Sequence, residues 1–256
     1  MIRRLALIAV FLLPAGIAGG TEEVVAGLSQ SSIAITANFD GSDLLIYGAV
    51  KREDRIPRDS ELDVIITVEG PSAPIMVRRK SRKFGIWVNT AAVDVDHAPS
   101  FYAVATTRPL NDILSQIEDL RRKVSVPQLI RSVGAPPDIQ DSPSFTDALI
   151  RIREENGLYS LHEGAVELEE DTLFRTDIDL PANLVEGEYR TRIFLVRDKK
   201  VVAANEALID VRKVGLERWL FDLAHKLPAA YGVLALFLAG LAGWLASTAF
   251  RLLRNG

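Results

Sequence analysis

Two short charged stretches carry the side chains best suited to chemistry in this sequence. The acidic one is DVDH, in which Asp94, Asp96 and His97 could offer carboxylate and imidazole ligands to a divalent cation. In a strand, alternation places Asp94 and Asp96 on one face and turns His97 away, unless the strand ends there. Aspartates before a proline more often form a solvated loop, and we therefore predict no metal site.

The basic stretch, VRRKSRKFG, places Arg78, Arg79, Lys80, Arg82 and Lys83 within six positions. On a domain held near a bilayer, such a stretch could bind anionic headgroups or the acidic face of a partner protein. The alternative is a solvated hairpin tip with no ligand. We take Arg78, Arg79 and Arg82 as candidate interaction residues.

Aromatic residues follow the basic stretch closely. Phe84 and Trp87 lie in FGIWVN, and Phe101 and Tyr102 lie in PSFYAVAT. Aromatic residues at this spacing usually belong to the core of a β-sandwich, whereas an exposed pair would mark a contact surface. Trp87 and Tyr102 are the candidates for such a surface.

The sequence lacks the motifs of the common catalytic sites: it has no Gly-x-Ser-x-Gly, His-Glu-x-x-His, P-loop or Gly-x-Gly-x-x-Gly. With no cysteine, it can form no disulfide, thiolate metal site or thiol nucleophile. Its formal net charge of −4 argues against a nucleic-acid partner. We expect neither an enzyme nor a cofactor.

Two apolar segments determine how these side chains are held. The stretch LPAAYGVLALFLAGLAGWLASTAF, residues 227–250, carries no charge, and as a helix rising about 1.5 Å per residue it would cross a hydrocarbon core of about 30 Å. We predict a transmembrane helix at residues 228–250. The start of the chain, MIRRLALIAVFLLPAGIAGG, has the basic, apolar and small-residue regions of a signal peptide, residues 1–20. The alternative there is an uncleaved anchor.

Together the two segments predict topology. Residues 21–213 would form a periplasmic domain on a bacterial inner membrane, because a cysteine-free exported domain suits the periplasm. Residues 251–256 would form a cytoplasmic tail, whose Arg251 and Arg254 satisfy the positive-inside rule. The lipid bilayer is thus the first expected partner.

The expected span and the segment before it each carry a possible contact surface. Ala235, Ala239 and Gly243 recur at every fourth position, a spacing that lets two membrane helices approach closely, so we expect an inner-membrane protein partner. Residues 214–227 predict an amphipathic helix at the membrane surface, with Trp219 on its apolar face. The alternative is a helix packed on the domain.

The remaining pattern predicts a mainly β fold. Alternating segments indicate strands at residues 31–50, 61–69, 74–89 and 99–107, and again from 164 to 213, with a helical insertion at about 108–158. Tyr189, two residues after Gly187 at the start of the penultimate strand, is typical of the tyrosine corner of an immunoglobulin-like β-sandwich. The rival interpretation is two small domains that meet near residue 108.

Several features of the sequence point to one known family. They are the secretory start, the lone C-terminal span and the four stretches LSQSSIAITANFDGSDLLIYGAV, GIWVN, APSFYAVATTRPL and EGEYRTRIFLVRDKKVV. With these features the chain resembles a family of alphaproteobacterial transmembrane proteins of unknown function. The resemblance covers nearly the whole chain. It implies the topology above and a bacterial source, and it implies no activity. Because members of the family tend to accompany permeases of the sulfite-exporter type, it also implies an accessory role beside such a permease.

The sequence therefore predicts a non-enzymatic, membrane-anchored periplasmic accessory or scaffold protein. Two alternatives stay open. One is a periplasmic module that binds a small ion or anion through the basic stretch or DVDH, and the other is an enzyme of unrecognised type.

Overall fold

The fold is described by a computed structural model over residues 22–36, 39–52, 60–130, 141–214 and 216–254. Of residues 216–219, 222 and 248–254 only the backbone is described. The expected signal peptide and the last two residues of the expected tail lie outside the described residues.

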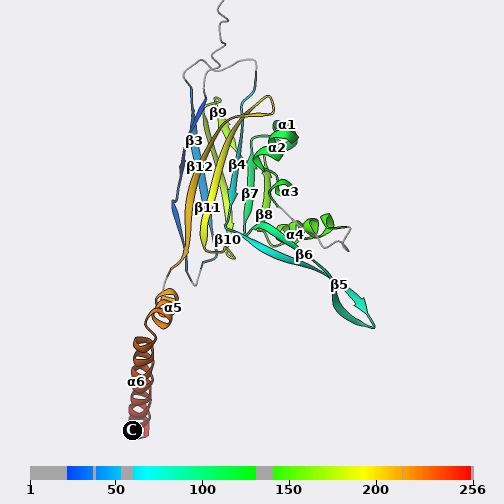
Figure 1. Cartoon of the computed structure of the whole chain (residues 1–256). Coiled ribbons are helices and arrows are strands. Elements are labelled where there is room, and N and C mark those ends of the chain that lie inside the picture. The colour runs from blue at the N-terminus through cyan, green and yellow to red at the C-terminus, as the bar shows by residue number, and fades with distance from the viewer. Residues whose placement is uncertain (1–21, 37–38, 53–59, 131–140, 215, 255–256) are drawn as a thin grey trace, which may run out of the picture.

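Two sheets stack to form a β-sandwich, and helices α5 and α6 leave it at one end (Figure 1). The smaller sheet has the order β1 (Glu23–Leu28), β3 (Gly41–Lys51), β10 (Leu173–Pro181), β9 (Glu167–Glu169). The larger sheet has the order β2 (Ser32–Ile35), β12 (Lys200–Lys213), β11 (Gly187–Arg197), β4 (Asp63–Glu69), β7 (Tyr102–Thr106), β8 (Tyr159–Glu163). Its edge strands are parallel to their neighbours, β2 to β12 and β8 to β7, and its other pairs are antiparallel. Each sheet joins strands from both ends of the chain, so one sandwich, and not two small domains, forms the body of the protein.

The main core lies between the two sheets. Alternate residues of each strand supply it, as Leu44 and Ile46 of β3 and Ile193 and Leu195 of β11 show. Each fully buried aliphatic side chain of this kind stabilises a fold by roughly 1.5–3 kcal/mol relative to exposure. Alternation along residues 189–195 predicts that Tyr189, Thr191, Ile193 and Leu195 share one face of a strand. In β11 all four are buried.

A second core covers the outer face of the larger sheet. Ile65, Val104 and Phe194 point to this side and pack with residues of α1 (Leu110–Ile113), α3 (Val126–Leu129) and α4 (Pro143–Glu155), whereas α2 (Gln116–Arg122) adds no apolar residue to this core. Every residue of β4 is buried, as expected for a strand with protein on both faces. The helical insertion therefore shields an apolar sheet face from water.

Several local predictions needed correction. The apolar spacing from Leu110 to Leu120 predicts one helix over 110–124. The segment instead forms two helices, because Ser115 adopts an extended conformation and its hydroxyl accepts a hydrogen bond from the Glu118 amide as the N-cap of α2. The turn residues Asp40–Gly41–Ser42 predict a strand on either side of one turn. These two strands are not neighbours, since β2 joins the larger sheet and β3 the smaller one.

A long hairpin, β5 (Ser72–Lys83) and β6 (Ile86–Pro99), forms a two-stranded sheet of its own. It projects from the sandwich toward the end at which α5 leaves, and its tip lies at about the level of α5 (Figure 1). The hairpin was predicted, but its basic residues were expected in the connection; they lie in the β5 arm, and the connection is only Phe84–Gly85.

The tyrosine corner is present. The Tyr189 hydroxyl, near the start of β11, donates a hydrogen bond of 2.9 Å to the carbonyl oxygen of Val185, and the tyrosine ring is buried. Burial raises the pKa of this phenol above its ordinary value. The contact fixes the loop that enters β11.

Replacing Tyr189 with Phe keeps the buried ring but leaves the Val185 carbonyl without its donor. We expect Tyr189→Phe to lower the free energy of unfolding by about 1–2 kcal/mol. Urea unfolding followed by circular dichroism measures the change. A variant as stable as the wild type would show that water replaces the hydroxyl at no cost.

Candidate functional site

The hairpin tip, defined as residues 80–89, carries three exposed large apolar side chains close together in the chain, and Phe84 is the most exposed large apolar side chain of the described residues. Phe84 is 106% exposed, Trp87 68% and Ile86 64%. Arg82 lies opposite Trp87 and Lys83 opposite Ile86 in the register of the hairpin. Because paired residues share a face and successive residues alternate, each face of the tip presents an exposed apolar side chain beside a cation: Trp87 beside Arg82 on one face and Ile86 beside Lys83 on the other.

The turn at the end of the tip has an unusual residue. Phe84 has φ 51° and Gly85 φ 84°, so both central residues of this two-residue turn are left-handed, as a type I′ turn requires. Glycine, asparagine and aspartate are the residues that adopt this conformation easily, whereas a bulky side chain is disfavoured there. Phe84 thus occupies a position that backbone preference alone would give to asparagine.

The middle of the hairpin is braced against α4 through Arg79, which lies opposite Ala91 in the register. The Arg79 guanidinium lies 2.7 Å from Asp141 Oδ2 and 2.6 Å from Ser144 Oγ, and it stacks 4.3 Å from the ring centroid of Phe145. The hydrogen bond from Arg79 holds the pKa of the Asp141 carboxyl below its ordinary value. Arg79 is therefore a bracing residue, while Arg78 and Arg82 stay exposed.

Of the two aromatic candidates, only Trp87 lies on a surface. Tyr102 is fully buried beneath the helices, and its hydroxyl donates a hydrogen bond of 2.6 Å to the Val124 carbonyl. Burial raises the pKa of this phenol far above its ordinary value. Strand β7 is covered on both faces, so we remove Tyr102 from the candidate contact residues.

The acidic stretch DVDH lies in β6. Asp94 and Asp96 are exposed and the valine between them is buried, so the two carboxylates share a face as predicted. His97 turns toward the sandwich, where its Nε2 lies 3.9 Å from Glu69 Oε1. Within the described part of the chain, no three His, Cys, Asp or Glu side chains are grouped as metal ligands would be.

Two hollows lie on the surface of the smaller sheet. One, of about 240 Å³, is lined by β3, β9 and β10 residues including Tyr47, Phe174 and Arg175. The other, of about 470 Å³, lies at Asp40, Asp43 and Asp179. The candidate residues of the sequence analysis line neither of them.

Helix α6 (Pro228–Arg254) follows α5 (Leu216–Lys226) and stands clear of the sandwich (Figure 1). Among the described residues it is the one helix long and apolar enough to cross a membrane, over Pro228–Ser247, and none of that window is buried in the protein. Ala235, Ala239 and Gly243 are all exposed, and a Cβ added at Gly243 would meet no atom within 4 Å. The side chain of Trp219, in α5, lies outside the described residues.

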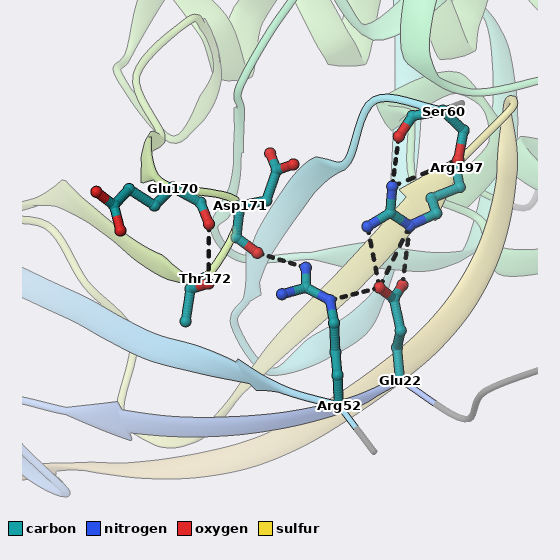
Figure 2. A network of polar contacts seen from close by, with 7 residues as sticks. All are labelled: Glu22, Arg52, Ser60, Glu170, Asp171, Thr172 and Arg197. Carbon is teal, nitrogen blue, oxygen red and sulfur yellow. Dashed lines mark hydrogen bonds and ion pairs between the residues drawn. The ribbon is translucent and has the colours of Figure 1, made fainter. Parts of the chain in front are cut away.

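Sequence reasoning missed one cluster of charges. Figure 2 shows Glu22, Arg52 and Arg197, which we call the arginine–glutamate cluster, at the end of the sandwich opposite α5. The Glu22 carboxylate lies 2.7 Å from Arg52 Nε and 3.0 Å from Arg197 Nη2, and all three side chains are less than a tenth exposed. Arg197 also donates to the Ser60 carbonyl at 2.6 Å, and Arg52 to the carbonyl of Asp171.

The arginine–glutamate cluster joins the two sheets. Glu22 and Arg52 flank β1 and β3 of the smaller sheet, whereas Arg197 ends β11 of the larger one. Burial by itself would raise the pKa of the Glu22 carboxyl, but the hydrogen bonds from Arg197 and Arg52 outweigh it and lower the pKa below its ordinary 4.5. The cluster closes the sandwich at its membrane-distal end.

The cluster makes stability depend on pH in the acid range. Because the pKa of Glu22 is lower in the folded state, its stabilising effect is present above pH 4.5 and is lost as the pH falls through the folded-state pKa. Glu22→Gln should lower the free energy of unfolding at pH 7 by about 3 kcal/mol, because two buried guanidinium groups lose their counter-ion. Melting temperatures of both proteins between pH 7 and 3 check this, and the gap between them should narrow in acid.

The turn gives a second prediction. Phe84→Asn should raise amide protection in β5 and β6, by about 1 kcal/mol or less, because asparagine accepts the left-handed conformation of a type I′ turn. Phe84→Val should lower that protection. Native-state hydrogen exchange measures both, and equal protection in the two variants would contradict the assigned turn.

Sequence comparison with known families accords with this architecture. The sequence model of the family described as "Putative transmembrane protein (Alph_Pro_TM)" matches residues 23–252, which include the sandwich, the hairpin and the apolar window of α6. No curated protein matches the chain. The chain therefore belongs to the Alph_Pro_TM family of transmembrane proteins.

Proposed function

We propose that this protein is a non-enzymatic accessory protein of the bacterial inner membrane. Helix α6 spans the bilayer, the sandwich stands in the periplasm as a scaffold, and the span binds an inner-membrane protein. The observation that carries the proposal is the exposed face of α6, on which Ala235, Ala239 and Gly243 form a ridge of small residues.

The ridge supports a protein contact within the membrane. Helices in lipid gain little from the hydrophobic effect when they associate, so close backbone approach at small residues decides where they meet. At 100° per residue, positions 235, 239 and 243 fall within a narrow sector of α6. Bulkier residues such as Leu236, Phe237 and Leu241 lie outside that sector and suit contact with lipid chains.

The sandwich has features of an immunoglobulin-like scaffold. The order β1-β3-β10-β9 corresponds to strands A-B-E-D of that fold, and β12-β11-β4 to strands G-F-C. The tyrosine corner at Tyr189 occupies its usual place at the start of strand F. Such sandwiches often serve as rigid supports, although a fold by itself assigns no function.

The partner that fits the proposal is a transport protein of the same membrane, and a sulfite-exporter-type permease is the specific candidate. A single span without a charged residue within its apolar window offers no ion path of its own. An accessory subunit needs none, because its partner supplies the path.

Affinity purification of the full-length protein from native membranes in mild detergent, followed by mass spectrometry, tests the proposal. We expect one abundant membrane protein to accompany the wild type and to be lost from the Ala239→Leu, Gly243→Leu variant, because the added side chains prevent close helix approach.

The matched control is Ala230→Leu, which makes the same kind of change about 180° away from the centre of the ridge. It should retain the partner. A wild-type protein that purifies alone, or a partner that survives the double substitution, would contradict the proposal.

A further inference from the structure

The hairpin tip exposes large apolar side chains, which a scaffold surface that contacts only water does not require. Phe84, Ile86 and Trp87 are all more than half exposed at the end of an arm that extends about 20 Å past Val77, the last residue of β5 that packs, partly buried, against the second core, at roughly 3.3 Å per residue. Exposing aromatic and aliphatic side chains to water is unfavourable, and covering them with another apolar surface removes that cost.

We propose that the hairpin tip is a second membrane contact, which inserts Phe84, Ile86 and Trp87 among the headgroups of the periplasmic leaflet and places Arg82 and Lys83 against the phosphates of anionic lipids. This inference rests on the proposed function in one respect: α6 must hold the sandwich at that leaflet.

The direction of the hairpin supports this contact. Figure 1 shows it leaving the sandwich toward the end that carries α5 and α6, with its tip near the level of α5, just before the apolar helix begins. The bracing of Arg79 against Asp141 and Phe145 holds the middle of the hairpin on α4. The arm therefore points its tip at the plane where the span enters the bilayer.

The arrangement of charges favours a lipid surface over a small anion. Arg82 and Lys83 lie on opposite faces of the hairpin, so their side chains diverge and do not converge on one ion. Residues 77–93 contain five cations and no acidic residue. Among the described residues, the side chains of Lys80, Arg82 and Lys83 form no ion pair with a carboxylate. A plane of phosphates can meet diverging cations together.

The apolar residues also suit lipid better than a single protein face. Trp87 lies on one face of the hairpin, Ile86 on the other and Phe84 at its end. A flat protein partner would cover one face, whereas headgroups and upper acyl chains surround an inserted tip on all sides. Tryptophan beside arginine is the pairing that membrane interfaces favour.

The turn supplies an independent argument. Phe84 occupies a left-handed position at which asparagine would be easier to accommodate, and its ring touches solvent over its whole surface. In the free protein, the exposed ring of Phe84 makes no packing contact that would offset the strain of its backbone conformation. Strain of this kind is typical of a functional residue, and here the function is insertion.

The test uses the full-length chain, whose lack of cysteine allows one label without background. Asn89→Cys, exposed on the same face as Trp87, carries the environment-sensitive dye NBD. The protein is reconstituted in nanodiscs of phosphatidylcholine alone or with equal phosphatidylglycerol, with and without a lipid that bears a nitroxide quencher at its headgroup.

We expect NBD emission to shift to shorter wavelength in phosphatidylglycerol discs, to be quenched by the nitroxide lipid, and to return toward its aqueous value in 0.5 M salt, as expected for screened charges. Arg82→Gln, Lys83→Gln should reduce the ratio of docked to undocked tip by about 30-fold, because each cation near an anionic leaflet contributes appreciably to binding. Phe84→Asn should weaken docking although it relaxes the turn.

The matched control for charge is Arg151→Gln, Arg190→Gln, which removes two exposed cations outside the hairpin and should dock as the wild type does. Emission that stays aqueous in discs, an equal shift in phosphatidylcholine alone, or a shift without quenching would overturn the inference; the last would mean contact with another copy of the chain. Resistance to alkaline extraction, measured on the same discs, reports on α6. If the tip stays in water while the chain resists extraction, the inference about the hairpin tip fails and the proposed membrane anchor α6 stands. If the chain is extracted, both the inference and the proposed anchor fail.

Discussion

An apolar helix of twenty residues has to be kept from water, and the rest of the architecture follows from that requirement. The window Pro228–Ser247 of α6 is not buried by any described part of the protein. A helix satisfies its own backbone hydrogen bonds, so lipid can serve as its whole environment. Strand β12 leads through α5 into α6, which holds one end of the sandwich at the membrane and leaves the other end far from it.

Different contacts stabilise the two ends of the sandwich. At the membrane-distal end, where β11 turns into β12 and β1 begins, the arginine–glutamate cluster joins the two sheets through a buried carboxylate. At the membrane-proximal end, Tyr189 fixes the loop into β11. The larger sheet is covered on both faces, by the smaller sheet and by α1–α4, and this cover gives the hairpin a firm base. A firm base allows a long, thin arm to keep its direction.

Much of the fold could be predicted from the sequence because its signals are local. Charge-free length identifies α6, and alternation together with Gly187 and Tyr189 identifies the last hairpin and its corner. Signals that depend on tertiary context failed. Ser115 reads as an ordinary helical residue until its capping role is seen, and β2 and β3 read as a hairpin although they cross between sheets.

Only part of the candidate site could be predicted from the sequence, because the rest of it depends on tertiary structure. The composition of the sequence identifies the basic stretch. The sequence does not distinguish Trp87 from Tyr102, because their burial depends on tertiary structure: the projecting hairpin exposes Trp87, and the helices bury Tyr102. Glu22, Arg52 and Arg197 lie far apart along the chain, so no local pattern announces their cluster. The left-handed conformation of Phe84 is likewise a property of the register that places it in the turn.

We propose that one span holds the sandwich on the periplasmic face of the membrane. The most direct test is labelling of single cysteines with a membrane-impermeant maleimide, since the chain has none of its own. Lys200→Cys, exposed at the end of the sandwich opposite α5, should react in spheroplasts with an intact inner membrane, whereas Arg254→Cys should react only after the membrane is permeabilised. Reaction of Arg254→Cys in intact spheroplasts, with Lys200→Cys protected, would contradict this topology.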